Sequence, residues 1–263
     1  MRPASVAASG LAAMLLLGAA AVAQPDLWIT VPGADGGTLR AAVFRPPAKG
    51  SFPAVFVFHG INGLSASVVD WGPALARAGF VTVIGCYFSA GWTLRAGDDM
   101  VDPCPRARGI FDADLLGNAA ALIAAGRRLS GVRGDRIGLL GHAMGGNLAL
   151  VLASSEVRVG AVVSISANPL RPLQLPHKPS GSALPAPIWS IERLHAPAIL
   201  FHGALDAVTP PTAAHEYVQR ARALGKNVQA HYYEGTGQDL WQSDRRADLI
   251  RRSARFLAAH LRR

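Results

Sequence analysis

The sequence contains few of the residues on which redox and cofactor chemistry depend. It has two cysteines and three lysines among 263 residues. It has neither a phosphate-binding G-x-x-x-x-G-K loop nor a dinucleotide-binding G-x-G-x-x-G motif after a first strand. After residue 23, no apolar run is long enough to cross a bilayer. We therefore expect no nucleotide cofactor and no membrane span in the mature chain.

Metal and nucleic-acid binding are also poorly supported. His215 and Glu216 begin an H-E-x-x-H pattern, but Gln219 stands where the second histidine would be, so we expect no metal site. The formal net charge is +9, yet the arginines are scattered, and their densest group lies in residues 248–263. That segment also carries an apolar stripe at helical spacing, which favours a docked helix with a solvated basic face over a nucleic-acid surface.

The N-terminal segment has the features of a secretory signal peptide. Arg2 precedes an apolar run, and small residues at 21–23 precede Gln24. An uncleaved anchor is the alternative. We expect residues 1–23 to direct export to the periplasm or the cell exterior. Residues 24–263 then form one domain with a substantial core, with a net charge of +8 once Arg2 is lost.

The two cysteines fit an exported protein. Cys86 and Cys104 could pair in an oxidising compartment. The bridge would close a loop of about 19 residues, which is worth about 3 kcal/mol in the loop-entropy model. Two free thiols are the alternative. We expect the disulfide because the segment between them lacks the pattern of a helix or strand.

Strand and helix patterns alternate along most of the chain. This alternation predicts a mostly parallel sheet with helices on both faces. Residues 168–187 are the exception, because six prolines deny them regular structure. This segment is either a cap over a site or a surface loop. The expected strands are 27–32, 38–46, 52–60, 80–87, 136–142, 160–166, 196–203 and 228–235, and the expected helices are 65–79, 112–129 with Asp112 as its cap, 144–154, 212–224 and 248–263.

Four segments in order carry a family resemblance. They are HGINGLSASVVDWGPALARAGFVTV, GLLGHAMGGNLAL, FHGALDAVTP and YYEGTGQDLW. In these segments the sequence resembles the dienelactone hydrolase family of the α/β-hydrolase fold. The resemblance implies a single α/β domain. It also implies a serine or cysteine nucleophile after the fifth core strand, an aspartate after a later strand, and a histidine near the end.

Two of the three catalytic positions implied by the resemblance have lost their chemistry. Ala143 occupies the nucleophile position, and a methyl group cannot attack a carbonyl. Asp206 occupies the acid position. Gln238 stands where the histidine is implied, and an amide cannot accept and return a proton near neutral pH. We expect the Gln238 amide instead to donate a hydrogen bond to Asp206.

The oxyanion hole depends on backbone N–H groups, so these side-chain losses leave it untouched. The resemblance places one donor at Met144 and the other at Gly60 or Ile61. These groups would bind a carbonyl or carboxylate oxygen of a small ligand. Binding of water alone is the alternative.

Three functions stay open at this point. The first is a non-catalytic member of the family that binds a small carbonyl or carboxylate compound, or a protein partner of unknown identity. The second is an ester or lactone hydrolase with relocated groups, for which Cys86 and Ser89 are the candidate nucleophiles. The histidines near the site, His59, His142 and His202, look like packing residues. The third is an inert relic without a ligand.

Overall fold

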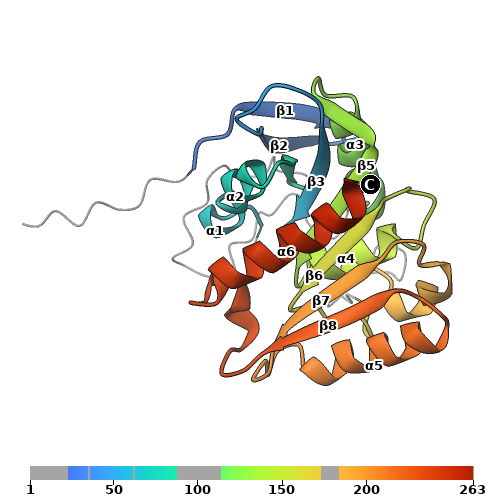
Figure 1. Cartoon of the computed structure of the whole chain (residues 1–263). Helices are drawn as coiled ribbons and strands as arrows, with labels where there is room; N and C mark the ends of the chain where they lie inside the picture. Colours follow the sequence, from blue (N-terminus) through green and yellow to red (C-terminus); the bar gives the residue numbers. More distant parts are fainter. Residues whose placement is uncertain (1–22, 35, 62, 88–113, 173–183, 263) are drawn as a thin grey trace, which may run out of the picture.

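The computed structural model describes residues 23–34, 36–61, 63–87, 114–172 and 184–262. Within them, eight strands form one sheet in the order β1-β2-β4-β3-β5-β6-β7-β8 (Figure 1). The pairs β1–β2 and β2–β4 are antiparallel, and all other neighbouring strands are parallel. The strands β1 to β8 span Leu27–Pro32, Thr38–Phe44, Phe52–Phe58, Val81–Gly85, Val132–His142, Ala161–Ile165, Ala198–Gly203 and Val228–Tyr233.

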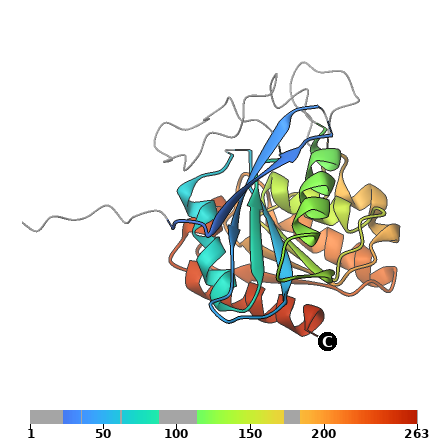
Figure 2. The ribbon, with the colours of Figure 1, turned by 90° about the horizontal axis from the view of Figure 1, so that it is seen from above.

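Helices cover both faces of the sheet (Figure 2). Along β3, Phe56 and Phe58 belong to one core cluster, whereas Val55 and Val57 belong to the other. Because both faces are covered, the strand is apolar along its whole length. The expected single-domain α/β-hydrolase architecture is therefore confirmed. One face carries α3 (Leu115–Arg127), α4 (Met144–Leu152) and α5 (Pro211–Ala223), and the other carries α1 (Ala66–Val69), α2 (Trp71–Arg77) and α6 (Arg246–Leu261).

Several expected boundaries are wrong for local physical reasons. The expected helix at 65–79 is broken into α1 and α2, because Pro73 has no N–H to donate back to the preceding turn. Asp114, rather than Asp112, caps α3, with its carboxylate accepting from the Gly117 N–H at 2.8 Å. Two short 3₁₀ helices, η1 (Pro187–Arg193) and η2 (Gln238–Gln242), were not expected from the sequence.

Some expectations fall outside the described residues. These are the signal peptide up to residue 22, Ser89, Cys104, Asp112 and the central part of the proline-rich segment, 173–183. Cys86 is buried after β4, and its predicted disulfide with Cys104 stays a prediction. Of the helices that the structure describes, none is both long and apolar enough to cross a bilayer.

Candidate functional site

A sharp turn joins β5 to α4 at the position expected for a nucleophile. Ala143 follows the last residue of β5 and precedes the first residue of α4. Its backbone lies in the left-handed region, with φ 49° and ψ −113°. A non-glycine residue with such angles costs on the order of 1–3 kcal/mol. The turn has therefore kept the strained geometry that would present a side chain at the end of the strand, although that side chain is now a methyl group.

Two glycines make this turn sterically possible. A Cβ on Gly145 would lie 2.2 Å from the carbonyl oxygen of Phe58 and 2.6 Å from that of His59. A Cβ on Gly141 would lie 2.1 Å from the carbonyl oxygen of Gly145. Neither position has room for a side chain, because α4 starts directly against the ends of β3 and β5. The close packing that defines the elbow is thus intact.

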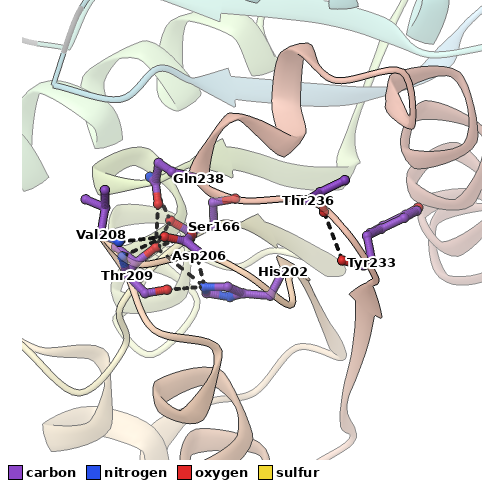
Figure 3. A network of polar contacts seen from close by, with 8 residues as sticks. All are labelled: Ser166, His202, Asp206, Val208, Thr209, Tyr233, Thr236 and Gln238. Atoms are coloured by element: carbon purple, nitrogen blue, oxygen red, sulfur yellow. Dashed lines mark hydrogen bonds and ion pairs between the residues drawn. The ribbon is translucent and has the colours of Figure 1, made fainter.

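The acid position lies after β7 and is enclosed. Asp206 is 3% exposed. Its Oδ1 accepts from the N–H groups of Val208 and Thr209 at 3.0 and 2.8 Å. Its Oδ2 accepts from the Thr209 hydroxyl at 2.7 Å (Figure 3). These donors compensate for the burial of the carboxylate, and they leave it little capacity to act on a water or a ligand.

Gln238, from η2, completes this enclosure. One atom of its amide group lies 2.9 Å from Asp206 Oδ1, 2.6 Å from Oδ2 and 2.6 Å from Thr209 Oγ1. Only the nitrogen can donate to two carboxylate oxygens, so hydrogen bonding assigns that atom as the nitrogen. The contact that the sequence led us to expect between Gln238 and Asp206 is therefore present.

His202 and Ser166 belong to the same network, and sequence reasoning did not place them there. His202 Nε2 donates to the Thr209 carbonyl at 2.6 Å and lies 3.5 Å from Asp206 Oδ2. Burial lowers the pKa of His202, which keeps its ring neutral at pH 7. The Ser166 carbonyl oxygen lies 3.0 Å from Thr209 Oγ1, whose single proton goes to the closer Asp206 Oδ2. The four-residue spacing from His202 to Asp206 is no signal for this contact, because His202 lies in strand β7 and Asp206 in the turn after it.

Replacing Gln238 with leucine tests the structural role of this amide. Gln238→Leu removes a donor from a buried carboxylate, so we expect a loss of about 1–3 kcal/mol in the free energy of unfolding. Urea denaturation at pH 7 measures it. The matched control is Gln242→Leu, an exposed glutamine of the same 3₁₀ helix, which should change stability by no more than about 0.5 kcal/mol. Equal losses in the two variants would contradict the assigned role.

A cavity of about 660 Å³ opens beside the elbow. Both Ala143 and Gln238 line it, whereas Asp206 lies behind Gln238 and does not. The cavity thus occupies the space in front of the position where a nucleophile would project. Its lining consists of Gly60, Ile61, Gly63, Ser65, Ser67, Val68, His142, Ala143, Val208, Gly235, Thr236, Gly237, Gln238, Asp239, Trp241, Gln242, Ser243 and Asp244.

The backbone groups expected to form an oxyanion hole flank this cavity. Gly60 and Ile61 line it, and Met144 is the first residue of α4, directly after Ala143. The N–H of Met144 has no carbonyl within its own helix to bond, as at any helix N-terminus. No backbone hydrogen bond from Ile61 or Met144 N–H to another described residue is formed. Both donors are therefore available for a ligand oxygen.

His142 forms part of the cavity wall, which corrects its expected role as a packing residue alone. Its ring lies 5.2 Å from the ring of Trp241, centroid to centroid. Its Nε2 is buried without a hydrogen-bond partner among the described residues. Burial lowers its pKa to about 4, with the backbone of Gln238 partly offsetting the effect. The imidazole is therefore neutral at pH 7, and its Nε2 forms no hydrogen bond with a hydroxyl of the described lining.

The other candidates for relocated chemistry lie away from the cavity. His59 is buried, stacks on Tyr87 at 4.6 Å, and has its Nδ1 2.7 Å from the Gly60 carbonyl oxygen. His231 packs against Tyr233 in β8. On the exposed side of α5, His215 and Gln219 form a hydrogen bond of 2.9 Å. Among the described residues, no three His, Cys, Asp or Glu side chains are grouped so that they could hold a metal ion.

Comparison with known proteins connects this geometry to one family. Residues 39–252 match the sequence model of the dienelactone hydrolase family. A protein of Bradyrhizobium sp. assigned as a 2-oxo-3-(5-oxofuran-2-ylidene)propanoate lactonase is 26% identical over 212 residues, which cover 80% of this chain and 82% of the relative. A Synechocystis protein assigned as a carboxymethylenebutenolidase is 25% identical over 227 residues, covering 82% and 87%. The fold matches a crystal structure from Klebsiella pneumoniae assigned as a dienelactone hydrolase, with a TM-score of 0.70 at 20% identity over 88% of this chain and 98% of that one.

Proposed function

The chain belongs to the dienelactone hydrolase family, and we propose that it is a non-catalytic member that binds a small carbonyl or carboxylate compound in the cavity beside Ala143. The single observation that carries this proposal is the methyl group at the elbow. The elbow presents Ala143 to the cavity with strained φ and ψ angles, but nothing in that side chain can attack a carbonyl.

The remaining polar groups favour binding over catalysis. Asp206 is saturated by backbone, hydroxyl and amide donors, and Gln238 cannot shuttle a proton. The N–H groups of Ile61 and Met144 can donate hydrogen bonds to a carbonyl oxygen without any contribution from side chains. A ligand oxygen held there would take the place that an oxyanion takes in an active hydrolase. Loss of the nucleophile therefore removes turnover, whereas the backbone groups that bind the ligand oxygen stay in place.

An active hydrolase with relocated groups is the second candidate. It requires a nucleophile and a base within hydrogen-bond reach of each other. The serine hydroxyls of the described lining do not meet this requirement. Ser65 and Ser67 bond each other at 2.9 Å, Ser243 donates to the Leu240 carbonyl at 2.9 Å, and His142 Nε2 bonds none of the three. This arrangement supports the non-catalytic proposal.

We also propose that the protein is exported and that Cys86 pairs with Cys104. The support is the signal-peptide pattern of residues 1–23 and the presence of two cysteines in the chain. On this proposal the cavity faces solutes of the periplasm or the cell exterior.

A thermal-shift titration tests ligand binding at the elbow. We expect ethyl butyrate, γ-butyrolactone or butyrate to raise the unfolding midpoint of the mature protein with dose. At a hundredfold excess over its Kd, a ligand adds about 2.7 kcal/mol of stability. Ala143→Trp should abolish the shift by blocking the elbow end of the cavity, where the N–H donors lie. Val208→Trp, at an exposed position of the rim, should weaken it.

The matched control is Ala223→Trp, which places the same side chain on an exposed position of α5. It should keep the full shift. A shift that survives Ala143→Trp unchanged would show that the ligand binds elsewhere, and no shift with any of the three compounds would contradict the proposal.

A further inference from the structure

We propose that the cavity selects a cationic compound that combines an uncharged ester or amide carbonyl with a positively charged group, and that it disfavours carboxylates, with Asp239 and Asp244 as the selecting residues. This inference rests on the proposed function, because it assigns a ligand charge to the same cavity. It distinguishes this chain from its Bradyrhizobium relative, which is assigned as the lactonase of a propanoate, an anionic compound.

The charge of the cavity lining is opposite to that of the whole chain. Basic residues outnumber acidic ones by 26 to 17 in the sequence. Among the described residues that line the cavity, however, Asp239 and Asp244 are the charged side chains, and there is neither lysine nor arginine. A third carboxylate, Asp206, lies behind Gln238. A ligand in this space therefore faces negative charge without a compensating cation from the described part of the wall.

The two arginines that follow Asp244 in the sequence, Arg245 and Arg246, neutralise these carboxylates only weakly or make their contacts elsewhere. Arg246 donates to the Ser67 carbonyl at 3.1 Å and lies 3.8 Å from Asp70. Arg245 lies 3.9 Å from Asp244, with both side chains mostly exposed, so solvent screens that pair. Asp239 has no ion pair with another described residue. We therefore assign it the larger part of the selectivity.

The two ends of the cavity differ in what they can bind. At the elbow, the N–H groups of Ile61 and Met144 and the N-terminus of α4 suit a carbonyl oxygen. His142 is neutral at pH 7 and adds no positive charge there. At η2 and the turn after it, the two carboxylates suit an ammonium group. A single ligand that spans both ends combines an ester or amide carbonyl with an amine.

Three esters of matched size test this charge selectivity. They are ethyl 4-aminobutyrate, which is cationic, ethyl butyrate, which is neutral, and monoethyl succinate, which is anionic. Isothermal titration calorimetry at pH 7 and low salt gives the three Kd values. We expect the cationic ester to bind at least about tenfold more tightly than the anionic one, because the two ligands differ by two unit charges close to carboxylates in a partly screened site. Raising the salt concentration should reduce the ratio of the Kd of the anionic ester to that of the cationic ester.

Charge-neutralising variants locate the effect. Asp239→Asn combined with Asp244→Asn should make the three Kd values similar and should leave the Kd of the neutral ester unchanged. The matched control, Asp135→Asn, removes an exposed carboxylate at the opposite end of β5 and should keep the ratio.

The outcomes separate the two proposals. If the neutral ester binds but the charged esters bind equally well, or the anionic one binds most tightly, the charge inference is overturned and the binding function stands. If the preference for the cation persists in the double variant, the selecting residues are not these two, and the inference is likewise overturned. If none of the three esters binds the wild-type protein, the binding function itself is contradicted.

Discussion

A chain that carries both Ala143→Ser and Gln238→His is expected to hydrolyse p-nitrophenyl acetate at least about 10³-fold faster than the wild type. Loss of a complete triad costs about 10⁶ in turnover in a serine protease, so partial recovery of that factor is a conservative expectation. The elbow already has the backbone angles that present a nucleophile. Position 238 already lies against Asp206, so a histidine there would find its orienting partner.

The single variants are the controls for this experiment. Ala143→Ser alone provides a nucleophile without a base, and Gln238→His alone provides a base without a nucleophile. Because triad members act as a unit, each single variant should give less than a tenth of the gain of the double variant. Adding Asp206→Asn to the double variant should remove most of the gain. Wild-type turnover equal to that of the double variant would favour relocated catalysis instead.

Acidification from pH 7 to pH 5 is expected to cost about 4 kcal/mol of stability through His59 and His142. In both residues burial lowers the pKa from 6.5 to about 4. The unfolded chain therefore takes up protons below pH 6.5 while the folded chain does not. The stabilisation is complete above pH 6.5 and is lost as the pH falls towards 4. At pH 5 each residue accounts for about 2 kcal/mol.

Urea denaturation at pH 7 and pH 5 measures this effect. His142→Phe keeps an aromatic ring against Trp241 but cannot titrate, so it should remove about half of the pH dependence. His215→Asn, at an exposed position of α5, is the control and should leave the pH dependence unchanged. Burial also lowers the pKa of His202, which adds to the acid effect in the same direction. Equal stability at the two pH values would contradict the prediction.

The expectations from sequence that the structure confirms depend on patterns within short segments of the chain. The apolar runs of β3 and β5, the glycines around Ala143 and the alternation of strand and helix are all visible within a few residues of sequence. The errors arose where one residue changes a local hydrogen bond. Pro73 divides one expected helix into two, and Asp114 takes the capping role because α3 begins at Leu115.

The candidate site could be predicted in its identities but not in its contacts. The motifs placed Ala143, Asp206 and Gln238 at the nucleophile, acid and histidine positions of the family. The loss of nucleophile and base follows from residue type alone. The position of His142 in the cavity wall did not follow, because a residue at the end of a buried strand can face either the core or the cleft. His142 packs beside Trp241 of η2, and this 3₁₀ helix begins at Gln238, 96 residues after His142 in the chain.

The family, the α/β fold and the absence of a nucleophile and a base at the expected positions all follow from the amino-acid sequence alone. These properties depend on periodicity and on which side chain occupies a motif position. Three further properties emerge from the folded chain: Asp206 is enclosed by donors, His142 lines the cavity, and the described lining has no lysine or arginine. These properties depend on contacts between segments that are far apart in the chain, where burial and charge are set by neighbours that no local pattern specifies.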